Sequence, residues 1–449
     1  MVVFWVPGRR ARLLAAAVAL SLVVLLFARA VPVATTPLAE LLTGRTVVID
    51  PGHGGPDPGC TKGGLVEKEL TLDLAKRVAE RFRQAAMRPV LTREGDCDLG
   101  DPSLTDLRQR KRDDLRRRAA LAESCQADLF LSLHANSFPS PVWSGAQVFY
   151  HQDSEAGRKL ASALQDVLVE ELRELGPNPR REKAADFYLL ARVKRPAAMV
   201  EVGFLSNPRE AALLADEEYR DRLATAIFHG AVRHLAAAAT GREAGPRSRE
   251  ANSGGPRELE QQRRWQAVAD RGPDEVVLYF AGPTNGEDWL IPELRLVRGF
   301  AGLPLEKRLE TAVQELAKGP GPGSALLGVL PEGTRVRRVA LAPGLVTVDL
   351  RPGFGTWTTG SYTEALAVYS VVNTVAELAP DCQVRLLIAG EAPALGHLAL
   401  PEALKPAPAL ALPGRNGAAG TLGSGRRRFC WWDVAPRRSF SVPSSSLAP

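Results

Sequence analysis

The chain has 449 residues, 45% of them hydrophobic, which is enough for two or three globular domains with well-filled cores. Its net charge of +6 suits attraction to anionic polymers, although an arginine-rich composition can equally reflect genomic base composition. The five cysteines are odd in number and include no Cys-x-x-Cys pair, so at least one is free or paired with another molecule. This pattern argues against a cysteine zinc site and does not indicate a disulfide framework.

The N-terminus has the layout of a secretory signal. Three arginines at positions 9, 10 and 12 precede the uncharged run Leu13–Phe27, which is followed by Ala28-Arg29-Ala30. That run of 15 residues is shorter than the ~18 expected of a membrane-spanning helix. We therefore predict that residues 1–34 are a signal peptide or membrane anchor, with cleavage after Ala30 or Ala34 favoured, and that the protein is exported.

Between residues 44 and 238, short apolar strand candidates alternate with long helical patterns. This alternation predicts an α/β domain with a mostly parallel sheet flanked by helices. The strand candidates are 46–50, 89–93, 129–134, 146–150 and 197–202, and the helical patterns begin near 67, 103, 155 and 208.

Two of these strands end on a histidine. The first runs into Pro51-Gly52-His53-Gly54-Gly55, and the 129–134 strand ends on His134, next to Ala135-Asn136. Because the carboxyl ends of parallel strands meet at one edge of a sheet, we expect the two imidazoles to lie close together as a metal pair. A lone histidine is more often structural, but both of these stand at strand ends beside glycine or asparagine.

Two glutamates complete the pattern. Glu67 begins a helix whose residues Leu70, Leu74, Val78 and Phe82 recur at every fourth position and should pack on the sheet. Glu201 ends the strand at 197–202. The ligand candidates are too far apart in sequence for a compact H-E-x-x-H helix, so the fold must assemble the site.

Four segments together resemble the zinc-dependent N-acetylmuramoyl-L-alanine amidases over about residues 45–237: Asp50–Gly55, Glu67-Lys68, Ser132–Asn136 and Glu201–Asn207. The resemblance implies Zn²⁺ held by His53, Glu67 and His134, with a fourth position where water acquires a pKa of about 7. It also implies that Glu201 takes a proton from that water and delivers it to the departing amine. The alternative for Glu201 is a salt-bridged carboxylate at a strand end.

Three further residues stand near these motifs. Asp50 can accept a hydrogen bond from a ligating histidine or cap the turn that follows it. Arg118 lies in a very basic helix expected at 103–127, and its position resembles that of an arginine in the family. Glu123 departs from the asparagine that the family tends to carry.

Residues 239–273 are polar and glycine-rich, which predicts a flexible linker. A smaller α+β domain is expected at 274–400, with strands at 275–280, 335–341, 346–350 and 383–390 and helices at 303–318 and 362–378. Its segments Leu330–Thr334, Val346–Leu350 and Tyr369–Thr374 resemble the GerMN domain of sporulation and germination proteins. The domain has no histidine between Asp274 and Gly396, so we predict binding or assembly and no chemistry. Residues 401–449 should be disordered.

Taken together, the resemblances imply an amidase that hydrolyses the bond between N-acetylmuramic acid and L-alanine in peptidoglycan, in spore cortex or cell-wall remodelling. The alternative is an inactive peptidoglycan-binding or scaffolding protein of sporulation. The expected partners are peptidoglycan and a sporulation or cell-wall protein complex bound through the GerMN-like domain, and no nucleic acid. A phosphate-cradling reading of Gly52–Gly55 fails because the Lys-Ser/Thr of a P-loop is missing.

Overall fold

The computed structural model describes residues 38–241, 256–282, 290–351, 361–393, 395, 397, 398, 400 and 402–406. The predicted signal or anchor at 1–34 lies outside the described residues, as does the predicted tail at 401–449 except for residues 402–406. Within the described part, none of the helices combines the length and apolar character that a bilayer span requires.

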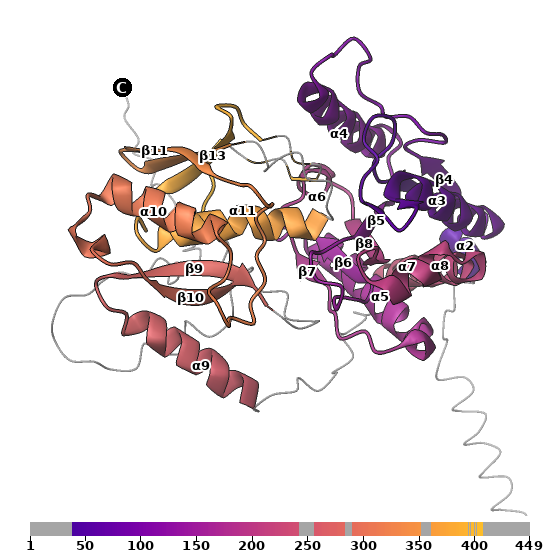
Figure 1. Cartoon of the computed structure of the whole chain (residues 1–449). Coiled ribbons are helices and arrows are strands. Elements are labelled where there is room, and N and C mark those ends of the chain that lie inside the picture. Colours follow the sequence, from indigo (N-terminus) through magenta and orange to yellow (C-terminus); the bar gives the residue numbers. More distant parts are fainter. Residues whose placement is uncertain are drawn as a thin grey trace, which may run out of the picture.

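The first domain is built on a six-stranded mixed sheet with the strand order β4-β1-β5-β8-β6-β7 (Figure 1). Neighbouring strands run parallel except β6, which is antiparallel to β8. The predicted mostly parallel sheet is therefore confirmed. The strands are β1 (Thr46–Pro51), β4 (Arg88–Leu91), β5 (Leu129–Asn136), β6 (Gln147–Tyr150), β7 (Lys183–Ala184) and β8 (Ala197–Phe204), and a small separate hairpin joins β2 (Thr61–Lys62) to β3 (Leu65–Val66).

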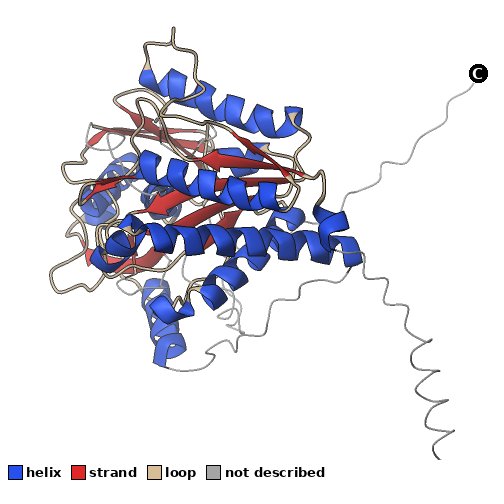
Figure 2. Cartoon of the chain, turned by 90° about the vertical axis from the view of Figure 1, so that its right-hand side faces the viewer, coloured by secondary structure: helices blue, strands red, loops and turns tan. Residues whose placement is uncertain are grey.

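Helices cover this sheet and alternate with its strands along the chain (Figure 2). Side-chain caps help to fix where several of them begin: Ser154 caps α5, Asn207 caps α7 and Asp216 caps α8. The helices are α2 (Leu38–Leu42), α3 (Glu67–Gln84), α4 (Leu107–Ser124), α5 (Glu155–Glu171), α6 (Tyr188–Arg192), α7 (Pro208–Ala215) and α8 (Glu217–Thr240), with a 3₁₀ turn at Arg173–Leu175.

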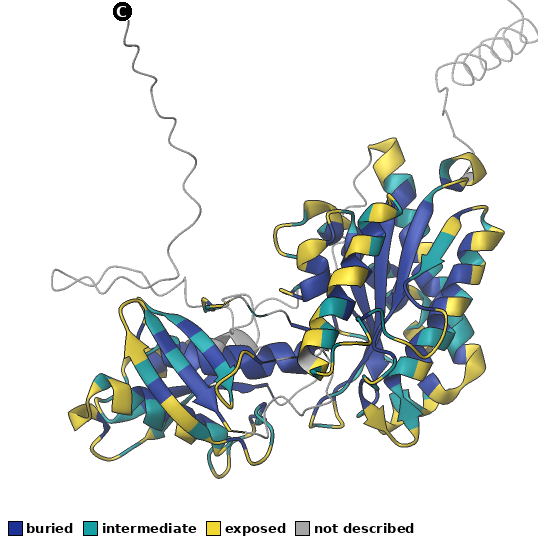
Figure 3. Ribbon diagram, turned by 90° about the horizontal axis from the view of Figure 1, so that it is seen from above, coloured by how far each residue is buried: buried dark blue, intermediate teal, exposed yellow. Residues whose placement is uncertain are grey.

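The alternation of side chains along the strands divides the core into two layers. Val47, Ile49, Leu131 and Val200 pack against α3, α5 and α8, where the predicted stripe from Leu70 to Phe82 is buried. Val48, Phe130 and Met199 point to the opposite face, toward α4, α6 and the second domain. Asp50, His134 and Glu201 have the parity of this second set, so the polar residues gather on the face that the second domain covers. Figure 3 shows the buried strands between the helices.

The described residues of the second domain form two small sheets and three helices. Strands β9 and β10 pair antiparallel, while β12 pairs antiparallel with β11 and parallel with β13. The elements are α9 (Pro256–Ala269), β9 (Glu275–Ala281), β10 (Leu290–Leu296), a 3₁₀ turn (Phe300–Gly302), α10 (Leu305–Ala317), β11 (Val336–Ala342), β12 (Leu345–Leu350), α11 (Ser361–Ala376) and β13 (Gln383–Ile388). Strand β10 was not among the predicted elements.

The structure differs from the predicted boundaries at the linker and at the tail, among other places. The linker predicted at 239–273 contains α9, because Trp265 and Val268 supply an apolar side that is buried against the second domain. The tail predicted from 401 begins with described residues that still pack: Leu404 is buried, and its backbone bonds to Val384 of β13. The described cysteines are all unpaired (Cys60, Cys97, Cys125 and Cys382).

The start of α11 docks on the first domain (Figure 1). The Tyr362 ring stacks on Phe149 of β6 with ring centroids 5.3 Å apart, and its hydroxyl bonds to Lys183 of β7. The Thr363 hydroxyl donates to the carbonyl oxygen of Ser137 at 2.6 Å, just beyond β5. Buried apolar residues of the two domains therefore form one continuous layer. This layer lies on the face of the large sheet that also carries Asp50, His134 and Glu201.

Candidate metal centre

The turn after β1 holds His53 in a conformation that a non-glycine residue rarely adopts, with φ at 63°. Two buried arginines fix this turn through its carbonyl oxygens. Arg118 donates to the oxygens of Pro51 at 2.9 Å and His53 at 2.7 Å, and Arg93 donates to that of Gly52 at 2.9 Å. Arg118, whose position resembles that of an arginine in the family, thus holds the backbone turn from which the His53 imidazole projects.

Asp50 does not serve as the acceptor for a ligating histidine, which was one of its two predicted roles. Its carboxylate accepts hydrogen bonds from Arg118 at 2.9 Å and from Thr92 and Ser132 at 2.6 Å. Burial would raise the pKa of Asp50, but Arg118 and the two hydroxyls outweigh it and lower the pKa to about 2. Asp50 is therefore a buried anion that anchors Arg118 beneath the His53 turn.

The structure brings the three predicted ligands together. His53 Nε2 and His134 Nδ1 each lie 3.1 Å from Glu67 Oε1, and all three side chains are buried. A fourth side chain, His397, joins the group with its Nε2 atom 3.1 Å from His53 Nε2. Ligand atoms of a tetrahedral zinc site with bonds of about 2.0–2.1 Å stand about 3.3 Å apart. The donor set and its spacing therefore fit a divalent transition metal such as zinc.

Glu67 is the first residue of α3, as predicted, and its carboxylate is oriented by backbone amides. Cys60 N donates to Oε2 at 2.8 Å and Ala135 N donates to Oε1 at 3.0 Å. The partial positive charge at a helix N-terminus also favours an ionised carboxylate there. Burial would raise the pKa of Glu67, but His53 and the hydrogen bond from His134 outweigh it, so that the pKa lies well below its usual range.

Gly52 leaves the space that His134 occupies. A Cβ atom at position 52 would lie 2.1 Å from His134 Cε1 and 2.5 Å from its Nδ1, which is far inside van der Waals contact. The glycine between Pro51 and His53 is thus required by the close approach of the second imidazole to the first turn.

Asp57 and Lys111 orient His53 from behind. Asp57 Oδ2 lies 2.8 Å from His53 Nδ1 and also binds the Lys111 ammonium, which comes from α4. A carboxylate on one ring nitrogen leaves the other, Nε2, to face the metal position. Burial alone would lower the pKa of His53, but Asp57 and Glu67 outweigh it and raise the pKa to about 10.

His134 is a neutral imidazole at neutral pH. Burial lowers its pKa to about 3, although the hydrogen bond with Glu67 works in the opposite direction. An imidazole in this state offers a lone pair at neutral pH. The site therefore combines an anionic oxygen with imidazole nitrogens, which is a typical donor set for zinc.

Glu201 lies beside this group on β8. It is fully buried, and the register of the parallel pair β5–β8 places it opposite His134, with both side chains on the same face of the sheet. The charge of Glu201 contributes to a raised pKa of Cys60, about 11, for which burial is the main cause. The carboxylate thus lies near the turn that contacts Glu67.

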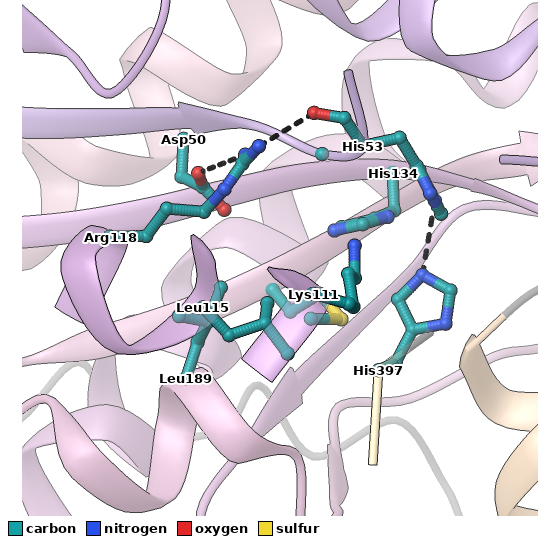
Figure 4. A pocket seen from close by; sticks show the side chains of 10 residues that line it. Asp50, His53, Lys111, Leu115, Arg118, His134, Leu189 and His397 are labelled. Atoms are coloured by element: carbon teal, nitrogen blue, oxygen red, sulfur yellow. Dashed lines mark hydrogen bonds and ion pairs between the residues drawn. The ribbon is translucent and has the colours of Figure 1, made fainter. Parts of the chain in front are cut away.

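The cavity next to the histidines is small. Leu115, Leu189 and Met199 line it together with His53, His134 and His397, and its volume is about 10 Å³ (Figure 4). That is the scale of the ~10–15 Å³ that holds one water molecule. Phe187, Tyr188 and Leu189, which precede β8, are all buried, and Leu189 reaches the cavity.

Sequence reasoning missed Asp57, Lys111 and His397. Asp57 sits four residues after His53 in an irregular loop, and Lys111 stands among arginines that favour a solvated face. His397 is one of only six histidines in the chain, and that scarcity was the available signal. The prediction that the second domain contributes no chemistry rested on the lack of histidine between Asp274 and Gly396, and His397 is the next residue.

Two family models match the chain. One, described as N-acetylmuramoyl-L-alanine amidase, matches residues 47–233, and the other, described as sporulation and spore germination, matches residues 277–393. Both agree with the resemblances found in the motifs.

Relatives cover the first domain. A germination-specific N-acetylmuramoyl-L-alanine amidase of Bacillus subtilis (strain 168) is 39% identical over 199 residues, which is 44% of this chain and 83% of that protein. N-acetylmuramoyl-L-alanine amidase LytC of the same strain is 36% identical over 207 residues, 45% of this chain and 38% of that protein.

Among solved structures, the CwlD amidase from Clostridioides difficile in complex with the GerS lipoprotein is 32% identical and has a TM-score of 0.41, covering 43% of this chain and 99% of that chain. The family model and a relative matched over most of its length agree with the motifs at the site on one family. The chain belongs to the N-acetylmuramoyl-L-alanine amidase family.

Proposed function

We propose that the first domain is a zinc-dependent hydrolase that cleaves the amide bond between N-acetylmuramic acid and L-alanine in peptidoglycan. The proposal is carried by one observation: His53, Glu67 and His134 come from three separated segments and lie together. His53 Nε2 and His134 Nδ1 are each 3.1 Å from Glu67 Oε1. The names of the relatives, which include a germination-specific amidase, support the same bond as the substrate.

When bound, zinc supplies a Lewis acid that polarises a carbonyl and lowers the pKa of water to about 7. The residues of this chain supply the rest of the chemistry. We assign to Glu201 the acceptance of a proton from the attacking water and its return to the L-alanine nitrogen as the C–N bond breaks, and its register with His134 supports this assignment. Asp57 and Arg118 hold His53 in place, so that the ligand set does not reorganise during the reaction.

The second domain supports a role in sporulation, because its family model is described by that process. We propose that it associates with a sporulation or cell-wall protein complex and that the protein acts outside the cytoplasmic membrane, where peptidoglycan lies. The arginine cluster and apolar run near the N-terminus support export.

The test is digestion of purified peptidoglycan by the zinc-loaded chain, followed by mass analysis of the soluble products. Release of stem peptides with free L-alanine amino groups supports the proposal, provided that His134→Ala and Glu201→Gln release none. New reducing sugar ends without free L-alanine amines would indicate a glycosidase and contradict it. Zinc binding without turnover in any form of the chain would favour the scaffolding alternative.

A further inference from the structure

His397 reaches the metal centre from the second domain, and both domains hold its backbone. Its amide nitrogen donates to Glu364 Oε2 of α11 at 3.0 Å, and its carbonyl oxygen accepts from Tyr188 N of α6 at 3.2 Å. Leu395 and Leu398 are buried on either side of it. The backbone of His397 is therefore held in place by contacts with both domains.

The imidazole rings of His53, His134 and His397 lie around one common point (Figure 4). The ring centroid of His397 lies 4.8 Å from those of both His53 and His134, and these two lie 5.0 Å apart. Each pair of rings is nearly perpendicular, with interplanar angles of 77° to 80°. Packing alone does not require such near-equal spacing, whereas shared coordination of one ion does.

Glu364 stands behind His397 at ion-pair distance, without the hydrogen bond that Asp57 makes to His53. Its Oε2 atom lies 3.3 Å from His397 Nδ1, the nitrogen on the far side of the ring from His53. A carboxylate behind an imidazole is the usual companion of a metal-bound histidine. Both residues are nine-tenths or more buried, with 3% exposure for Glu364 and 5% for His397.

We propose that His397 is a fourth protein ligand of the metal and that the described conformation is a closed, latent form of the enzyme. This inference rests on the proposed function, since it presumes a metal held by the other three ligands. Catalytic zinc sites keep one coordination position open, whereas four protein ligands are typical of structural sites. The cavity of about 10 Å³ also leaves no room for a glycan chain or a stem peptide. Activity then requires withdrawal of His397, with the start of α11, from the first domain.

The test uses the full chain with Co²⁺ in place of zinc, because the visible absorption of Co²⁺ reports its coordination and exchangeable ligands. Three forms are compared: wild type, His397→Ala and His397→Phe. The phenylalanine form keeps a ring over the site but removes both nitrogen atoms. His229→Phe is the matched control, since His229 lies half-exposed on α8 and pairs with Glu171.

In wild type we expect the strong absorption of four-coordinate Co²⁺ and no change when thiocyanate is added. Both His397 variants should show a changed spectrum, and His397→Ala should respond to thiocyanate. Chelators should remove the metal about tenfold faster or more from both variants than from wild type, the scale seen when a metal site loses support. The proposal would be overturned if the wild-type spectrum changed with thiocyanate as the His397→Ala spectrum does, and if chelators removed the metal from both forms at the same rate. If His397→Ala does not fold, the wild-type response and the phenylalanine form decide the question.

Activity measurements separate this inference from the proposed function. Zinc-loaded His397→Ala should release stem peptides about tenfold faster than wild type, the gain expected when a closed state populated at about 90% is removed. If wild type and His397→Ala release stem peptides at equal rates and have the same cobalt spectrum, the latent form is wrong but the amidase assignment is unaffected. A changed cobalt spectrum without release of stem peptides in any form defeats the amidase assignment but keeps His397 as a ligand.

Discussion

The guanidinium of Arg118 donates a hydrogen bond to the backbone carbonyl of His53 at 2.7 Å, which couples a buried residue of α4 to the conformation of a metal-ligand candidate. The same side chain binds Asp50, Asp114 and the carbonyl of Pro51. A lysine cannot make these contacts together, because it carries a single point-like ammonium.

Arg118→Lys is therefore expected to lower the free energy of unfolding by about 3 kcal/mol, from the loss of charge-assisted hydrogen bonds. It should also weaken metal binding, since the His53 turn loses its support. Denaturant unfolding and competition with a chelator measure the two effects. Arg116→Lys is the control on the same helix, where an exposed ion pair contributes about 0–1 kcal/mol. Equal effects of the two substitutions would show that Arg118 does not position the turn.

The buried carboxylate of Asp50 predicts a pH dependence of stability. Its pKa is about 2 in the folded protein and has the ordinary value of 3.8 in the unfolded chain. Because the folded value is the lower one, ionised Asp50 stabilises the fold above about pH 4 by about 2 kcal/mol, and this contribution is lost as the pH falls toward 2. Between pH 5 and pH 3 about 1 kcal/mol should disappear. The difference in unfolding free energy between wild type and Asp50→Asn should shrink by that amount, and a constant difference would contradict the assignment.

The predicted ligands can be tested by metal content. His134→Ala should lose most of its bound zinc, because a lone-pair donor is removed from a buried set. Elemental analysis of the purified chain after dialysis measures the loss. His229→Ala should retain wild-type zinc, since its ring lies on the outer face of α8. Unchanged zinc in His134→Ala would rule out this ligand.

Gly52 offers a test that leaves every candidate ligand residue unchanged. Gly52→Ala places a methyl group where the His134 ring lies, so the imidazole must move away from Glu67. We expect metal affinity to fall by about tenfold or more, as it does when ligand orientation is lost. Gly95→Ala is the control, since a Cβ atom there meets no atom within 4 Å. Chelator competition on both variants gives the comparison, and equal affinities would refute the steric argument.

Glu201→Gln separates proton transfer from metal binding. The substitution keeps the shape of the side chain, so zinc content and thermal stability should stay near the wild-type values. Release of stem peptides should fall about 10²–10⁴-fold, the usual contribution of a general acid or base. Glu69→Gln, in the exposed part of the first turn of α3, is the control. A variant that digests peptidoglycan at the wild-type rate would remove Glu201 from the mechanism.

Local patterns predicted the first domain well. The strand runs, the stripe from Leu70 to Phe82 and the histidines at strand ends are all set by short-range periodicity, and parallel pairing then brings His53 and His134 to one edge. The position of Glu67 follows for the same reason, since a helix start is a local signal.

Other features depend on tertiary contacts that no local pattern records. A proline is unfavourable inside a strand, and Leu290–Leu296 contains Pro292, yet β10 forms there as the pairing partner of β9. Helix α9 has few apolar residues, and only its packing on the second domain buries Trp265. Asp57 acquires its role from the left-handed turn at His53. The fourth histidine belongs to a segment whose neighbours in sequence say nothing about a metal.

The order in which the parts of this site are synthesised follows from the spacing of its histidines. His53 and His134 are 81 positions apart, whereas 344 positions separate His53 from His397. Closing the longer loop costs about 1 kcal/mol more in chain entropy, and during synthesis it must also wait for the whole second domain. Under the proposed assignment, His53, Glu67 and His134 can therefore assemble and take up metal before His397 has been synthesised. A chain interrupted before residue 397 would hold an uncapped metal centre, so completeness of the polypeptide itself governs when the site closes.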